Sequence, residues 1–556
     1  MPGTPSTLIS GSPKFTAPRL ADIAATQGPL AAWRNAVEAN PKTAASEVTG
    51  DFAAGFTDEQ GRSFLAVDRF SIQTICYSVV DGQLRFAARA DELADATTEI
   101  DPQAIFDYLY FHVIPSPRTI FKGIFRIPAG HFAWFENGRI SVAPYWVPEF
   151  DEISNPSFDG LKTEFRRLLQ ESVATRLDGG KPACFLSGGT DSSTIVGMTA
   201  LASGKTPDTY SIGFDAQGYD EMEYARLAAK HFKAEHHEYY VTPEDLVQSI
   251  PKVAAHFDQP FGNSSALPAY FCAKMARDNG VTRLLAGDGG DELFGGNSRY
   301  AKQRVFGWYG HVPSFLQKQL LEPVLGTRAA AALALTRKAG SYVEQARVPM
   351  PDRLQMYNLV MRLGPTEVLT PQVMAKVDVT LPLDLQRAVW NAANGSTLLN
   401  QELAFDWRFT LAECDLPKVI GATSLAQISV GFPMLDDHLL AFSQRLPSDY
   451  KLKGSQLRWF FKEALRGFLP DDILTKKKQG FGLPFGVWAN GHPALKALAS
   501  ESLHSLANRG VVRQDFVQTL LTQRLPEHPG YFGEMVWILM MLEQWLAAKV
   551  PGFRLT

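Results

Sequence analysis

Two glycine-rich segments carry residue types and spacing that suit nucleotide chemistry. The first, residues 185–193, reads Phe-Leu-Ser-Gly-Gly-Thr-Asp-Ser-Ser and stands where an apolar run gives way to a helical pattern. Two glycines let the backbone turn sharply and approach a ligand, and a helix N-terminus offers unpaired N–H groups and partial positive charge. The serine hydroxyls add donors, and Asp191 can hold Mg²⁺ beside phosphates. The segment therefore predicts a phosphate-binding loop.

This loop differs from the phosphate loop of kinase-like enzymes. No G-x-x-x-x-G-K-[ST] string occurs in the chain, so the lysine that such enzymes direct at the terminal phosphates is missing. Ser-Gly-Gly alone suits a plain turn before a capped helix equally well. The longer string after a buried strand favours the nucleotide interpretation.

The second segment, residues 284–296, again places a glycine-rich turn after an apolar strand, and it contains three carboxylates. An acidic loop of this kind suits a metal ion. If Asp191 and Asp291 meet at the ends of neighbouring strands, both can bind one Mg²⁺ that bridges a triphosphate. The alternative is a solvated turn with a carboxylate that caps a helix.

Strands and helices alternate around these segments, as in a parallel sheet covered on both faces. Helical spacing of apolar residues runs through Phe165 to Val173, and a short apolar run follows at 183–186. The further predicted elements are a helix at Ser192–Ala202, a strand at Thr209–Phe214, a helix at Glu221–His231, and strands near Glu238 and at Arg283–Leu285. From Tyr300 onward the pattern is largely helical. The predicted class is α/β, with a doubly wound parallel sheet and a helical C-terminal part.

The chain before this sheet has a different character. Up to Tyr145, short apolar runs alternate with turn signals such as Asp81-Gly82 and Asn137-Gly138, which indicates a mostly β segment. Residues 146–158 have the composition of a linker. Two domains are therefore predicted, at 1–150 and 158–556.

Composition excludes several partners. The chain has 556 residues, 45% apolar, and its 54 basic and 58 acidic residues give a net charge of −4, without a charged block that would bind nucleic acid. Its four cysteines are widely spaced, unlike a zinc or redox site. Neither a secretory signal nor a membrane span is predicted. We expect a cytoplasmic protein without nucleic-acid or membrane partners.

The first loop resembles the pyrophosphate loop of the ATP pyrophosphatase superfamily, and the Gly-Asp-Gly-Gly-Asp-Glu-Leu-Phe-Gly-Gly string at 287–296 resembles the asparagine synthetase family in particular. Ser211–Phe214 is similar to the strand end that contacts adenine in that family. The resemblance implies ATP and Mg²⁺, with Asp191 and Asp291 as metal ligands. The implied ATP-binding residues are Leu186, Ser187, Gly188, Gly189, Asp191, Ser192, Ser193, Ile212, Gly213, Phe214, Gly287, Asp288 and Gly289.

Two later strings extend the resemblance. Phe432–Asp436 is similar to the family's V-P-F-L-D, and Lys476–Gly482 to its R-K-K-Q-G-F-G, which places Lys478 at the catalytic lysine. A lysine suits the reaction because a point charge beside the α-phosphate and acyl oxygen stabilises developing charge. Without the flanking match, three lysines in a row would indicate a solvated basic run.

The chain departs from the family at two places. Glutamine-using members begin with cysteine, whereas this sequence offers Pro2, and the stretches that line the glutamine pocket are missing. No other cysteine has a free N-terminal amine, so we expect a truncated, inactive glutaminase-like domain. Ser429 and Gly431 stand where the family has glutamate and arginine. Glu413, Asp415 or another carboxylate could take the place of the missing glutamate.

The resemblance implies a carbon–nitrogen ligase that converts ATP to AMP and pyrophosphate. Such an enzyme adenylates a small-molecule or peptide carboxylate and transfers the acyl group to ammonia or another amine. The amine could belong to the same substrate, as in β-lactam synthetases and lasso-peptide cyclases. A pseudoenzyme that binds ATP without turnover is the alternative from another class. By analogy with family members, the chain could pair as a homodimer.

Overall fold

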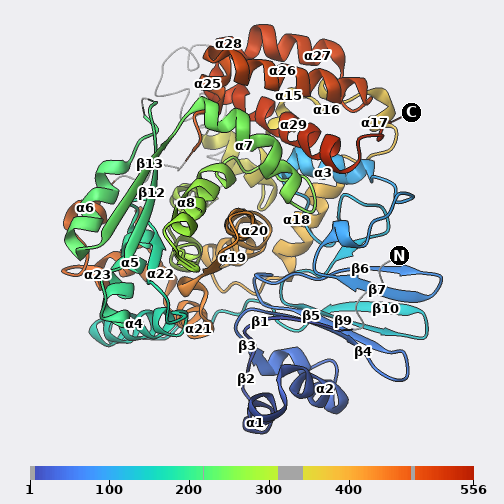
Figure 1. Ribbon diagram of the computed structural model, residues 1–556. Coiled ribbons are helices and arrows are strands. Elements are labelled where there is room, and N and C mark those ends of the chain that lie inside the picture. Colours follow the sequence, from blue (N-terminus) through green and yellow to red (C-terminus); the bar gives the residue numbers. More distant parts are fainter. Residues whose placement is uncertain (1–6, 217, 311–341, 477–481, 556) are drawn as a thin grey trace.

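The N-terminal part of the chain is built on two antiparallel sheets (Figure 1). The computed structural model describes residues 7–216, 218–310, 342–476 and 482–555. The larger sheet has the order β1-β4-β5-β9-β10, with bounds β1 (Thr7–Gly11), β4 (Phe52–Thr57), β5 (Ser63–Val67), β9 (His131–Glu136) and β10 (Arg139–Pro144). The smaller has the order β7-β6-β8, with bounds β6 (Cys76–Val80), β7 (Gln83–Ala87) and β8 (Phe125–Arg126). Strands β2 (Lys14–Phe15) and β3 (Val48–Thr49) form a separate pair.

The predicted tight turns are confirmed. Asp81-Gly82 connects β6 to β7, and Asn137-Gly138 connects β9 to β10. All four residues have positive φ, at 51°, 72°, 52° and 74° respectively. Two successive positive φ values match the right-handed twist of a hairpin, and asparagine, aspartate and glycine tolerate them best.

The prediction of a mostly β segment was incomplete, because three helices cover these sheets. Helices α1 (Pro18–Gln27) and α2 (Pro29–Ala39) lie on the outer face of the larger sheet, where Trp33 packs against Phe52 and Phe64. Helix α3 (Pro102–Phe111) belongs to the core that also includes residues of the smaller sheet. Each helix has proline in its first turn, where the missing N–H costs nothing.

The second part contains the predicted doubly wound sheet. Five strands, all parallel, follow the order β13-β12-β11-β14-β15. Helices α5 and α6 lie on one face, with α4 beside them, while α8 and α20 lie on the other (Figure 1). The strands are β11 (Ala183–Phe185), β12 (Asp208–Phe214), β13 (Glu235–Val241), β14 (Arg283–Leu285) and β15 (Ser429–Gly431). The helices are α4 (Phe158–Ala174), α5 (Thr190–Ser203), α6 (Met222–Phe232), α8 (Ala266–Asp278) and α20 (Leu416–Leu425).

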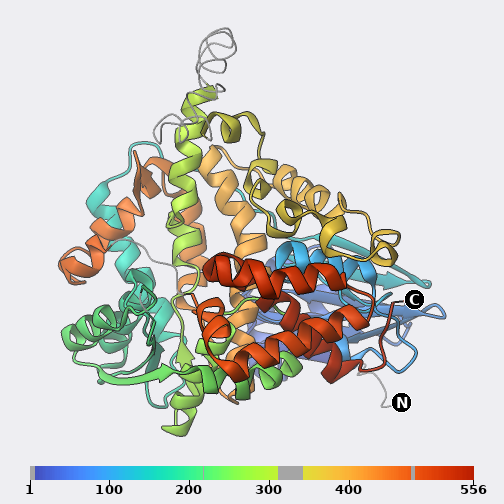
Figure 2. The ribbon, with the colours of Figure 1, turned by 90° about the horizontal axis from the view of Figure 1, so that it is seen from above.

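The rest of the chain is largely helical, as predicted. Figure 2 shows the helices near the C-terminus lying along the first domain. The main helices are α7 (Pro243–His256), α9 (Gly290–Phe294), α10 (Ser298–Gly310), α18 (Leu381–Ala392), α19 (Leu398–Asp406), α21 (Asp437–Arg445), α23 (Trp459–Leu465), α25 (Phe485–Gly491), α26 (Pro493–Asn508) and α29 (Pro529–Lys549), together with the π-helix η5 (Trp407–Asp415). None of the helices in the described ranges combines the length and apolar character needed to cross a bilayer.

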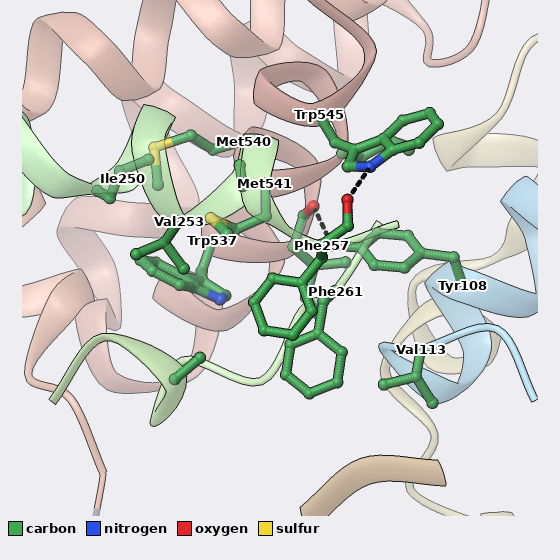
Figure 3. Packing of buried hydrophobic residues seen from close by; sticks show 14 of the residues in the cluster. Tyr108, Val113, Ile250, Val253, Phe257, Phe261, Trp537, Met540, Met541 and Trp545 are labelled. Carbon is green, nitrogen blue, oxygen red and sulfur yellow. Dashed lines mark hydrogen bonds between the residues drawn. The ribbon is translucent and has the colours of Figure 1, made fainter. Parts of the chain in front are cut away.

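One hydrophobic core joins the two parts of the chain. Tyr108 of α3 donates a hydrogen bond from its hydroxyl to the Ile538 carbonyl of α29, at 2.8 Å. Trp545 of α29 donates its indole N–H to the Phe257 carbonyl at 3.0 Å (Figure 3). The centroid of its ring lies 5.8 Å from that of Phe121. The first domain is therefore held by apolar packing as well as by polar contacts.

A buried lysine lies beneath the segment that connects the domains. Lys451 has no exposed surface, its Nζ donates to Asn400 Oδ1 at 3.2 Å, and it lies 5.0 Å from the Phe150 ring centroid. The Asn400 amide in turn donates to Glu152 at 2.6 Å. Burial lowers the pKa of Lys451 to about 7, although the charge of Glu152 acts in the opposite direction.

Lys451→Met is expected to change how stability depends on pH. The folded pKa of Lys451, about 7, lies below the value near 10.4 typical of an unfolded chain, so between these values the unfolded state binds one more proton. This lysine alone makes the free energy of unfolding rise with pH, by up to about 1.4 kcal/mol per unit. Urea unfolding from pH 7 to 9.5 should therefore show the stability advantage of Lys451→Met over wild type shrinking as pH rises. For the exposed control Lys453→Met, the difference in free energy of unfolding from wild type should not change with pH. If the difference for Lys451→Met is also independent of pH, the lowered pKa of Lys451 is contradicted.

Candidate active site

The first glycine-rich loop connects β11 to α5 in a sharp turn. Gly188 has a φ of +72°, and a Cβ there would lie 2.6 Å from the Ala225 backbone nitrogen. Gly189 is the N-cap of α5 and no side chain caps the helix, so its first N–H groups face the loop. The loop therefore needs glycine for both its conformation and its contact with α6, and it presents the helix N-terminus as predicted.

The serine hydroxyls of this loop point in different directions. Ser187 Oγ and Ser192 Oγ lie 3.1 Å apart, and the backbone N–H of Ser187 donates to Ser192 Oγ at 3.2 Å. Ser193 is fully buried, and its hydroxyl has no hydrogen-bond partner among the described residues. Ser187 and Ser192 can thus reach a ligand, whereas Ser193 faces the interior.

The second loop packs directly on the first turn of α5. A Cβ on Gly290 would lie 2.1 Å from Asp191 Oδ1, and one on Gly287 would lie 2.8 Å from the Ser192 nitrogen. These separations leave no room for a side chain. The glycines in this acidic string allow the two loops, about a hundred residues apart in sequence, to touch.

Gly290→Ala is expected to disturb the site more than the fold. The added methyl group must displace the Asp191 carboxylate, at a cost of about 1–3 kcal/mol, which is typical of overpacking. We expect a lower unfolding midpoint and weaker binding of Mg²⁺-ATP by calorimetry. Gly530→Ala is the matched control, because a Cβ at Gly530 would meet nothing within 4 Å. Unchanged ATP affinity in Gly290→Ala would contradict the close approach.

A buried arginine connects the two predicted metal ligands. Arg458 Nη1 donates to Asp191 Oδ2 and to Asp291 Oδ1, both at 2.7 Å, and Arg458 Nη2 also donates to Asp191. Burial would lower the pKa of Arg458, but the charges of Asp191 and Asp291 outweigh it and raise the pKa. The two carboxylates therefore meet, as the sequence predicted, with Arg458 between them, and their role as metal ligands stays a prediction.

The loops open into a cavity of about 890 Å³ at the carboxyl ends of β11 and β14. The predicted residues that line it are Leu186, Ser187, Gly189, Asp191, Ser192, Ile212, Gly287, Asp288, Gly289 and Asp291. Gly188, Ser193, Gly213 and Phe214 do not line it. Lys478 lies outside the described residues, so its catalytic role stays a prediction.

A second ion pair lines the cavity, at the start of the lysine run in the sequence. Lys476 Nζ lies 3.0 Å from Glu221 Oε1 and 4.3 Å from the centroid of the Tyr224 ring. Both charged side chains are largely buried. This lysine, two residues before Lys478, is therefore attached to α6 and its N-terminal flank and is not a solvated surface charge.

Ser429, which stands at the position of the family glutamate, and the two carboxylates that could replace that glutamate lie in different places. Ser429 begins β15, away from the carboxyl ends of the strands, and its hydroxyl donates to the Thr282 carbonyl at 3.2 Å. Glu413 is buried against Arg408 and accepts a hydrogen bond from Ser116 at 2.7 Å. Asp415 lines the cavity, where its Oδ1 lies 3.0 Å from Lys418 Nζ. Of these three residues, only Asp415 reaches the cavity.

Comparison with known proteins agrees with this architecture. Residues 164–547 match the family model described as asparagine synthase, and residues 34–146 match a glutamine amidotransferase domain. The first match covers more than half of the sequence, and the chain therefore belongs to the asparagine synthase family. It is an ATP-dependent ligase of the amide-forming class.

Similar proteins occur in bacteria and in fungi, among other organisms. Asparagine synthetase (glutamine-hydrolyzing) 1 of Bacillus subtilis is 26% identical over 513 residues, which cover 91% of this chain and 79% of the relative. A putative asparagine synthetase (glutamine-hydrolyzing) of Mycobacterium tuberculosis is 25% identical over 461 residues, with coverages of 79% and 68%. Amidase chyE of Penicillium rubens is 24% identical over 529 residues, with coverages of 83% and 74%.

Proposed function

We propose that this chain is an AMP-forming amide synthetase that adenylates a carboxylate and transfers the acyl group to ammonia or another amine. The observation that supports it most is the convergence of Asp191 and Asp291 on one cationic position beside the serine-glycine loop. A loop of this kind suits the phosphates of ATP, and paired carboxylates suit a cation that offsets their charge.

The donor set fits Mg²⁺. Two carboxylates from neighbouring loops, together with phosphate oxygens and water, match the oxygen ligands that this ion prefers. Arg458 shows that the position accepts positive charge in the buried site. Bound by these two carboxylates, with Arg458 displaced from between them toward the phosphates, Mg²⁺ would supply charge that offsets the departing pyrophosphate.

The chain's own residues would perform the remaining tasks. The α5 N-terminus, Ser187 and Ser192 would hold the phosphates so that a substrate carboxylate can approach the α-phosphorus in line. Arg458 would stabilise negative charge as pyrophosphate forms. The wall of the cavity would limit the access of water to the acyl adenylate.

We further propose that the nitrogen comes from ammonia or an amine and not from glutamine hydrolysed by this chain. Its four cysteines are buried or half-buried, and burial raises the pKa of Cys76, Cys184 and Cys414 to about 12 and that of Cys272 still further. Such thiols are poor nucleophiles near neutral pH.

The proposed function predicts equal amounts of AMP and pyrophosphate. Purified protein would receive Mg²⁺-ATP with aspartate plus ammonia, with aspartate plus glutamine, or with neither, and products would be identified by mass. If aspartate fails, a panel of other carboxylates replaces it. Release of ADP and phosphate would contradict AMP formation, and release with glutamine but not ammonia would contradict the nitrogen source. ATP binding without pyrophosphate release under any mixture would favour a non-catalytic protein.

A further inference from the structure

Within the described ranges, the basic side chains that line the cavity differ in whether a carboxylate neutralises them. Most of them form an ion pair with a carboxylate of the same chain. These pairs are Arg458 with Asp191 and Asp291, Lys418 with Asp415, Lys476 with Glu221, and Arg466 with Glu463. Lys462 also lines the cavity, but its side chain makes no ion pair or hydrogen bond to any residue that the structure describes.

Helix α23 places Lys462 beside Arg458. Arg458 is the N-cap of this helix, and the backbone N–H of Lys462 donates to the Arg458 carbonyl at 2.9 Å. Residues four apart in a helix lie on one face, one turn from each other. Asp291 acts electrostatically on both side chains. Lys462 therefore lies at the end of the cavity where Asp191 and Asp291 meet, which is the expected position of the departing pyrophosphate.

This position is unfavourable for a lysine while the cavity holds no anion. Lys462 is half-buried, and burial together with the charge of Arg458 lowers its pKa, whereas Asp291 acts in the opposite direction. Like charges one helical turn apart destabilise a helix, and a charge that is partly removed from water without a partner adds to the cost. An anionic ligand bound beside α23 would offset both effects.

We propose that Lys462 binds the β- and γ-phosphates of ATP and holds them as they leave as pyrophosphate. An ammonium group supplies three hydrogen-bond donors and a compact positive charge, which suits phosphate oxygens. Charge-assisted hydrogen bonds of this kind are stronger than those between neutral groups. The assignment deepens the proposed function and rests on it, because it names the residue that recognises the leaving group.

The step at which Lys462 acts involves one bond formed and one broken. An oxygen of the substrate carboxylate attacks the α-phosphorus, and the bond from this phosphorus to the oxygen shared with the β-phosphorus breaks. Pyrophosphate departs with the electron pair of that bond. Lys462 keeps its proton throughout and offsets the negative charge that develops on the leaving group.

Binding is tested without turnover. The affinities of Mg²⁺-pyrophosphate and of AMP would be measured separately by calorimetry, for wild type, Lys462→Met, Lys462→Arg and Lys496→Met, which changes an exposed lysine on α26. Lys462→Met should bind pyrophosphate at least about tenfold more weakly, as expected for loss of a charge-assisted hydrogen bond, and should bind AMP normally. Lys462→Arg should recover most of the affinity, and Lys496→Met should match wild type for both ligands.

The unfolding midpoint gives a readout that a structural role would not produce. Without ligand, Lys462→Met should be at least as stable as wild type, because methionine removes an unpaired, half-buried charge and keeps an unbranched side chain. Mg²⁺-pyrophosphate should raise the midpoint of wild type more than that of Lys462→Met, since tighter binding to the folded state stabilises it more. A lower midpoint in unliganded Lys462→Met would assign the lysine to the fold and contradict the proposal.

The other outcomes also decide the proposal. Equal pyrophosphate affinity in wild type and Lys462→Met would overturn it, as would an equal loss of affinity for AMP, which lacks the terminal phosphates. Weaker binding of aspartate with normal binding of pyrophosphate would assign Lys462 to the substrate carboxylate instead. Weaker pyrophosphate binding in Lys462→Met, in a protein that releases ADP and phosphate, would support the role of Lys462 while contradicting the proposed AMP-forming reaction.

Discussion

Asp291→Asn is expected to lower pyrophosphate release by at least about a hundredfold and to make ATP binding independent of Mg²⁺. Asp191→Asn should behave in the same way, because both carboxylates meet at one guanidinium group of Arg458. Asparagine keeps the shape of the side chain but removes the charge that a divalent ion requires. Either substitution alone should therefore abolish most of the binding of the divalent ion by the two carboxylates.

The measurement combines kinetics with metal removal. ATP affinity would be determined by calorimetry with Mg²⁺ and with EDTA, for wild type, Asp291→Asn and the surface variant Glu171→Gln. Wild type and Glu171→Gln should lose affinity in EDTA, whereas Asp291→Asn should bind ATP equally weakly in both conditions. If Asp291→Asn keeps the wild-type response to EDTA, the ion binds elsewhere.

Trp545→Ala is expected to destabilise the whole chain by about 3–5 kcal/mol, the usual cost of deleting a large buried aromatic side chain. Trp545 is fully buried and donates a hydrogen bond to the Phe257 carbonyl (Figure 3). Its ring also packs against that of Phe121 in the first domain. The substitution should therefore lower the stability of both domains together.

Urea unfolding followed by far-UV circular dichroism and by tryptophan fluorescence would test this. The two probes should shift together in Trp545→Ala, because the domains share one core. Val487→Ala, at a position 46% exposed on α25, should stay within about 0.5 kcal/mol of wild type. A separate early transition confined to the N-terminal domain would contradict the shared core.

The architecture around the nucleotide loops was largely predictable from the sequence. Short apolar runs, glycine turns and helical spacing are local signals, and they predicted β14 with its observed bounds and α5 and β12 to within two residues. The meeting of Asp191 and Asp291 also followed from a local rule, since the carboxyl ends of neighbouring parallel strands share one edge. Such patterns can be recognised in a sequence because side chains on one face of a helix or strand recur at a fixed spacing.

The helices of the first domain were missed for an identifiable reason. Helix α3 is apolar and buried almost all round, so it has no amphipathic period to recognise. Its start was nevertheless marked by Asp101-Pro102, where the aspartate caps the helix by accepting from the Gln103 N–H at 2.9 Å. Proline in the first turn of α1 and α2 was a similar signal.

Arg458 could not be predicted from its neighbours. It stands 267 residues after Asp191, outside any recognised string, with a φ of +56° that is uncommon for arginine. Its role depends on a tertiary contact.

The shared core has a consequence for how such a chain can change over generations. Tyr108 and Phe121 contribute to the packing of α29, so the first domain supports the second whether or not it performs chemistry. Selection on the synthetase site therefore preserves the first domain even if its own activity disappears. Such a domain is kept for its contribution to stability. Its residues that pack against the second domain should stay constrained, whereas its other residues can change.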